Sequence, residues 1–132
     1  MWALCLALQG TACRSTSMIG PNLGEPTVLR VGEVAQFPGE GLRIGFTSVD
    51  EDSRCPPDVV CVWAGVAKVA AWAEMAPKPR AEFVLATNNA VGPSEARYEN
   101  YSIELLNLSP RSTGAVPQAD YRLTLVVRTK GP

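Results

Sequence analysis

Apolar and polar residues alternate along several short runs of the chain, and no run keeps a helical period of 3.6 over ten residues. The last run is the clearest, and one face of it carries Tyr121, Leu123, Leu125 and Val127. Prolines and glycines separate it from similar runs at 28–37 (broken at Gly32), 42–49, 66–74, 81–87 and 101–109. This pattern predicts an all-β fold: a single small antiparallel β-sandwich or barrel of about seven short strands.

Size and charge narrow the class of protein. The chain has 132 residues, of which 46% are hydrophobic, so it is long enough for one domain with one core. Its 12 basic and 13 acidic side chains are spread along the sequence and give a net charge of −1. Because no basic stripe is present, we expect no nucleic-acid partner.

The chain contains no histidine. This excludes Ser-His-Asp and Cys-His nucleophilic machinery, and it removes the usual ligands of catalytic zinc. Acid–base chemistry would fall on Asp, Glu, Lys or Tyr, whose ordinary pKa values lie far from neutrality. We therefore predict that the chain is not an enzyme and holds no cofactor.

The amino terminus has the features of an export signal. Residues 1–8, M-W-A-L-C-L-A-L, are uncharged and apolar but too few to span a bilayer, so we interpret residues 1–12 as a signal-peptide remnant. The following L-Q-G-T-A-C resembles the lipobox of bacterial lipoproteins, in which the cysteine is lipidated and becomes the mature N-terminus. That resemblance implies lipidation of Cys13. The alternatives are a plain secretory signal and an N-terminal strand with ordinary cysteines.

Residues 13–25 are rich in Ser, Thr, Gly, Pro and Asn, which is typical of a flexible tether. We therefore divide the chain into the remnant at 1–12, the tether at 13–25 and an all-β domain at 26–132. An acylated Cys13 would hold this domain at a membrane without inserting it. The expected location is the bacterial cell envelope, lipid-anchored and facing the periplasm or the exterior; otherwise the protein is secreted.

The densest group of unusual residues lies at 50–73, D-E-D-S-R-C-P-P-D-V-V-C-V-W-A-G-V-A-K-V-A-A-W-A. In an exported chain, Cys55 and Cys61 are most simply a disulfide. A metal site is the rival interpretation, but two thiolates without histidine or a second cysteine pair make a poor zinc site. A redox pair is weaker, because the usual motif places its cysteines closer together.

The acidic residues of this stretch suggest a second hypothesis. Asp50, Asp52 and Asp58 lie near a constrained loop and could bind calcium, which takes six to eight oxygen ligands. Their spacing does not match an EF-hand loop. The alternative is a turn in which Arg54 pairs with Asp52 or Asp58.

Two tryptophans flank the same region. Trp63 follows Cys61 by two positions, and we expect it to pack on the disulfide in the core. If Val69, Ala71 and Ala73 face inward, Trp72 faces outward and belongs to a contact surface; in the opposite register it is core. Arg54, beside a rigid loop, is a further candidate for a contact surface, as in a protease inhibitor.

Residues 52–67, D-S-R-C-P-P-D-V-V-C-V-W-A-G-V-A, resemble a D-S-R-C-P-x-D-V-x-C-V-W-A-G signature of uncharacterised bacterial lipoproteins and secreted proteins. In that family an F-x-x-V strand precedes the signature, as Phe46 and Val49 do here, and a strand like 121–127 closes the domain. The resemblance implies export and a disulfide. It implies no activity and no catalytic residue.

These observations predict an exported, membrane-tethered β domain that acts as a binding or envelope-associated module. Its partners would be the membrane, through the lipid anchor, and an unidentified protein or small molecule. An exposed apolar or aromatic patch would favour this function. The alternatives are a calcium-stabilised domain and a small enzyme that uses carboxylates converging in a cleft.

Overall fold

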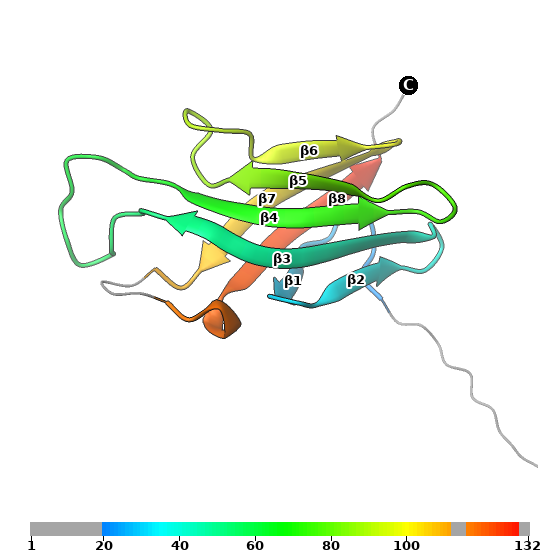
Figure 1. Cartoon of the computed structure of the whole chain (residues 1–132), viewed down its shortest axis with the longest axis horizontal. Helices are drawn as coiled ribbons and strands as arrows, with labels where there is room; N and C mark the ends of the chain where they lie inside the picture. The colour runs from blue at the N-terminus through cyan, green and yellow to red at the C-terminus, as the bar shows by residue number, and fades with distance from the viewer. Residues whose placement is uncertain (1–19, 112–115, 130–132) are drawn as a thin grey trace, which may run out of the picture.

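The chain folds into two four-stranded antiparallel sheets that pack face to face, as the computed structural model shows for residues 20–111 and 116–129 (Figure 1). One sheet has the order β1 (Thr27–Arg30), β8 (Arg122–Thr129), β7 (Tyr101–Ser109), β6 (Glu95–Tyr98). The other has the order β2 (Val34–Phe37), β3 (Leu42–Asp52), β4 (Ala67–Glu74), β5 (Ala81–Ala86). A short 3₁₀ helix, η2 (Gln118–Asp120), precedes β8. The predicted all-β fold is confirmed, and it is a sandwich.

The core lies between the sheets and follows the alternation of the sequence. Along β4, Val69, Ala71 and Ala73 are buried, whereas Trp72 is only half-buried on the opposite face. This confirms the inward register that the sequence suggests. The largest fully buried side chains come from both sheets: Phe37, Leu42, Ile44, Phe46, Leu85, Ile103, Leu108, Leu123 and Leu125.

Two local features were harder to predict. The break at Gly32 moves the chain from one sheet to the other, since Gly32 has φ 90° and its N–H donates to the carbonyl of Phe46 at 2.7 Å. The strand β6, which no run in the sequence predicts, has four residues and buries only Tyr98 fully. It forms because a tight turn pairs Tyr98 with Tyr101.

The domain begins before residue 26. Residues 20–25, predicted to be tether, contact the sandwich: the Gly24 N–H donates to the Val127 carbonyl at 2.7 Å, and Leu23 packs against the core. A Cβ on Gly20 would lie 2.3 Å from the carbonyl oxygen of Gln36, so the backbone there is in close contact with β2. The predicted remnant at 1–12 and Cys13 lie outside the described residues.

The hairpin of β3 and β4 continues past the end of the sandwich. Beyond the strands, the Ser53 N–H donates to the Val66 carbonyl at 2.7 Å, and the Cys55 N–H donates to the Ala64 carbonyl at 3.3 Å. The connecting loop therefore protrudes from the end opposite the β2–β3 turn (Figure 1). Within the residues that the structure describes, no helix is long and apolar enough to cross a membrane.

Candidate binding site

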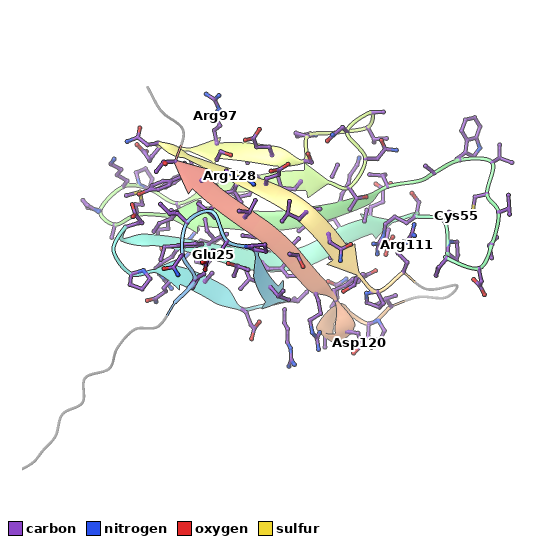
Figure 2. The ribbon with its side chains drawn as sticks, turned by 180° about the vertical axis from the view of Figure 1, so that it is seen from behind. Glu25, Cys55, Arg97, Arg111, Asp120 and Arg128 are labelled. Atoms are coloured by element: carbon purple, nitrogen blue, oxygen red, sulfur yellow. A yellow bond between two sulfur atoms is a disulfide. The ribbon has the colours of Figure 1, made fainter. Side chains whose placement is uncertain are left out.

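The loop at the end of this hairpin is closed by a disulfide between Cys55 and Cys61, whose Cα atoms lie 5.9 Å apart. The predicted disulfide is confirmed. We call residues 55–63 the disulfide loop. Figure 2 shows Cys55 where the chain leaves the sandwich, with Arg111 at the same end of the molecule. Pro56 and Pro57 fix two backbone φ angles inside the ring, so little conformational freedom is left there.

The disulfide loop exposes apolar side chains to solvent. Val60 is 100% exposed, Val62 89% and Trp63 81%, and Val59 is 48% exposed. The prediction that Trp63 packs in the core is wrong. The reason is that the hairpin carries Trp63 past the end of the opposite sheet, which leaves no layer for it to pack against. Exposed apolar clusters are typical of interaction sites.

Arg54 holds the base of the hairpin extension against the other sheet. Its Nε lies 2.8 Å from Asp52 Oδ1, and its two terminal nitrogens donate to the carbonyls of Leu108 and Pro110. The side chain of Arg54 is only 9% exposed. The pairing of Arg54 with Asp52 is therefore confirmed, but it joins the end of β3 to the hairpin extension and is not part of a turn. The prediction of Arg54 as a contact residue is wrong, because its donors are already used inside the domain.

The contacts at the base of the hairpin extension also set the protonation states of Asp52 and Tyr121. The hydrogen bonds from Arg54 lower the pKa of Asp52 below its ordinary value, against the opposing effect of burial. The Tyr121 hydroxyl also donates to Asp52, at 2.7 Å. Burial and this hydrogen bond raise the pKa of Tyr121 to about 12. At neutral pH the base thus contains a carboxylate between a guanidinium and a neutral phenol.

The structure does not gather the three candidate calcium ligands. Asp50 accepts a hydrogen bond from the Ser48 hydroxyl at 2.7 Å, Asp52 is held by Arg54 and Tyr121, and Asp58 lies in the disulfide loop. Among the described residues, no group of three or more His, Cys, Asp or Glu side chains could hold a metal ion. The proposed calcium site is therefore not formed by the side chains that the sequence suggests.

Trp72 faces outward on β4 but is covered by charged groups. The guanidinium carbon of Arg80 lies 3.8 Å from the centroid of the indole, and that of Arg43 lies 5.6 Å away. The Glu74 carboxylate lies 3.0 Å from the guanidinium of Arg43 and 3.4 Å from that of Arg80. The ring also lies over Gly45, where a Cβ would come within 2.1 Å of it. The exposed aromatic patch is therefore at Trp63 and not at Trp72.

A cleft of about 810 Å³ lies at the base of the disulfide loop, between the hairpin extension and β7. Its lining combines leucines of β7 with polar side chains, among them Asn88, Asn107 and Arg111. Among the described residues that line it, Glu104 is the one carboxylate, and it pairs with Arg128 at 2.8 Å. The converging pair of carboxylates that the enzyme hypothesis requires is not present in this cleft.

Comparisons of the chain with protein-family models, curated proteins and solved structures give no significant match. The resemblance of residues 52–67 to a lipoprotein signature therefore stays a prediction.

Proposed function

We propose that the chain is an exported, membrane-tethered β-sandwich that binds a partner through its disulfide loop. The observation that carries this proposal is the exposure of Val60, Val62 and Trp63 on a loop whose shape is fixed by a disulfide. Large apolar side chains are costly to leave in water, and tryptophan is among the residues that contribute most at protein interfaces.

The loop is built for binding with a small entropy cost. The disulfide, Pro56, Pro57 and the two backbone hydrogen bonds of the extension restrict it before any partner arrives. Burying valine-sized or larger side chains contributes roughly 1.5–3 kcal/mol each. Four such groups together contribute about 6–12 kcal/mol, from which the cost of association is subtracted.

Export and tethering are supported by residues at two places. A disulfide persists in oxidising compartments, which fits the periplasm or the exterior and not the cytosol. The lipobox-like sequence before Cys13 supplies the anchor in this proposal. The domain would then be held in the bacterial cell envelope, with its loop available to envelope partners.

The intact mass of the protein from its native host tests the export part of the proposal. We expect a chain that begins at Cys13 and carries lipid, and a gain of about two mass units when the disulfide is reduced. A chain that keeps Met1, has no lipid and has free thiols at Cys55 and Cys61 would contradict it.

Photo-cross-linking in the native host tests the binding part. A photoreactive benzophenone residue at Val60 should give adducts of higher mass, and the same residue at Val91, which is also exposed but lies in the β5–β6 loop, should not. Equal labelling from the two positions, or no labelling from either, would argue against the disulfide loop as a binding surface.

A further inference from the structure

We infer that the disulfide loop inserts into an apolar pocket of a second, different protein, and that a lysine or arginine at the rim of this pocket faces Asp58. The inference rests on the proposed function, since it names the partner's chemistry at the same loop. The argument uses the loop's charge, its position in the fold and its rigidity.

Charge is the first observation. Asp58 is the one charged residue of the nine in the disulfide loop, and it lies directly before the exposed Val59 and Val60. Of the nearby cations, Arg54 is engaged with Asp52 and Lys68 with Glu51 at 3.7 Å. Arg111 lines the cleft at the base of the loop, and among the described residues it forms no ion pair with Asp58. Burial of the valines desolvates the Asp58 carboxylate, which is costly unless the partner supplies an opposite charge. The partner therefore needs a basic side chain at the rim of its pocket.

A lipid surface does not meet this requirement. Loops and helices that bind bilayers combine apolar side chains with lysines or arginines, because bacterial and other anionic lipids attract positive charge. The disulfide loop has no basic residue, and insertion of a carboxylate into the hydrocarbon region costs about 2.5–3.5 kcal/mol.

Position in the fold gives a second reason. Gly20 lies beside Gln36 and Pro38, at the end of the sandwich opposite the disulfide loop (Figure 1). The 11 residues of β3 separate these ends by roughly 35 Å. The seven Cα–Cα steps from Cys13 to Gly20 span at most about 25 Å. The disulfide loop therefore lies farther from Gly20 than the tether can extend, and the anchor does not by itself bring the loop to the membrane.

A second copy of this chain is also a poor partner. An apolar groove of about 480 Å³ lies beside β1 and β2, and the exposed Val28 and Val34 line it. Among the described residues that line it, the charged one is Glu33, whose carboxylate accepts a hydrogen bond from the backbone N–H of Arg30 at 2.7 Å. Docking of the loop there would bring Asp58 close to a like charge, which is unfavourable.

The test uses the full chain in its native host, with the photoreactive residue at Val60 and a second substitution at Asp58. Reversal of the charge by Asp58→Lys should lower the adduct yield at least about tenfold, and Asp58→Asn should lower it by a smaller factor. Glu82→Lys makes the same charge change on an exposed residue of β5 and should leave the yield unchanged. Circular dichroism of each variant establishes that it is folded.

Identification of the adduct completes the test. We expect a different protein, in which a change of one rim lysine or arginine to glutamate restores the adduct with Asp58→Lys. Labelled lipid, a dimer of this chain, or adducts that are insensitive to Asp58→Lys would overturn the inference while leaving a binding role for the loop intact. Absence of any adduct specific to Val60 would instead overturn the proposed function itself.

Vesicles of phosphatidylethanolamine and phosphatidylglycerol provide an independent readout. The purified protein without its lipid anchor should not sediment with them, and Trp63→Ser should make no difference. Sedimentation that is lost in Trp63→Ser would favour a bilayer as the partner and overturn the inference.

Discussion

The Tyr121 hydroxyl donates a hydrogen bond of 2.7 Å to the carboxylate of Asp52, and this contact joins the end of β3 to the residue before β8. The two residues are 69 positions apart in the chain, and β3 and β8 belong to different sheets of the sandwich. Arg54 binds the same carboxylate from the other side. The base of the hairpin extension is thus held by a three-residue network that spans both layers.

Removal of the Tyr121 hydroxyl should destabilise the domain. We expect Tyr121→Phe to lower the free energy of unfolding by about 1–2 kcal/mol, because the Asp52 side chain is only 19% exposed and would lose one of its donors. Urea denaturation measures this. In a double-mutant cycle with Asp52→Asn, the two losses should be clearly less than additive; full additivity would show that the contact contributes nothing.

Acid should remove the contribution of Asp52. Because the folded pKa lies below the ordinary value of 3.8, the unfolded chain takes up the proton first as pH falls. The stabilisation is therefore complete above about pH 5 and is lost as pH falls below 4 through the folded pKa. Urea denaturation from pH 7 to pH 2 should show a smaller loss of stability in Asp52→Asn than in the unsubstituted chain. Identical curves would exclude this carboxylate as a source of acid sensitivity.

Alkali should act through two tyrosines. The hydrogen bond to Glu40 raises the pKa of Tyr101 to about 12, and burial does the same for Tyr121. Their stabilisation is complete below the unfolded pKa of about 10 and falls as pH rises toward 12. Absorbance of tyrosinate near 295 nm, followed with unfolding, should show late ionisation that Tyr101→Phe and Tyr121→Phe each reduce. Ionisation of every tyrosine near pH 10 in the folded protein would contradict this.

The two tryptophans of the central region should differ in their effect on stability. Trp63→Ser should change the free energy of unfolding by less than about 0.5 kcal/mol, since the side chain is exposed in the folded state. Trp72→Ser should cost about 1–2 kcal/mol, because it uncovers Gly45 and removes the stacking of Arg80. The pair serves as its own control, and a large loss in Trp63→Ser would show that this indole is packed in the core after all.

Gly65 should not tolerate a side chain. Its φ is +72°, and a Cβ would lie 1.9 Å from the carbonyl oxygen of Ser53. We expect Gly65→Ala to destabilise the domain by more than about 2 kcal/mol and to disturb the hairpin extension. Gly39→Ala is the matched control, because its φ is not left-handed and no atom lies near its Cβ position. Thermal unfolding of the two variants should separate them by several degrees.

The fold was largely accessible from the sequence because alternation reports which side of a strand is buried. Runs such as 42–46 and 121–127 alternate over enough residues to identify their strands. The strand β6 could not be predicted in this way, since its four residues are too few to show a period. The docked segment at 20–25 could not be predicted either, because its composition is that of a linker.

The candidate site was less accessible, since its geometry depends on contacts between distant residues. The sequence predicts the disulfide and the pairing of Arg54 with Asp52, which are local. It cannot show that Arg54 also binds the carbonyls of Leu108 and Pro110, more than fifty positions away. Nor can hydrophobicity show whether Trp63 lies between the sheets or beyond them. The one sequence feature that points to an exposed Trp63 is the apolar V-V-C-V-W run, which lacks the alternation of a half-buried strand.

Because β3 and β4 continue past the sandwich, two properties of the disulfide loop depend on different parts of the hairpin: its distance from the domain and the side chains that it presents. The ring between Cys55 and Cys61 determines which side chains are presented, whereas the length of the paired strands determines how far from the domain they stand. Two added residues on each strand would move the ring outward by about 6.6 Å without changing which face of the hairpin is buried. A scaffold of this design can be adjusted to the depth of a partner's pocket and to its shape by independent substitutions.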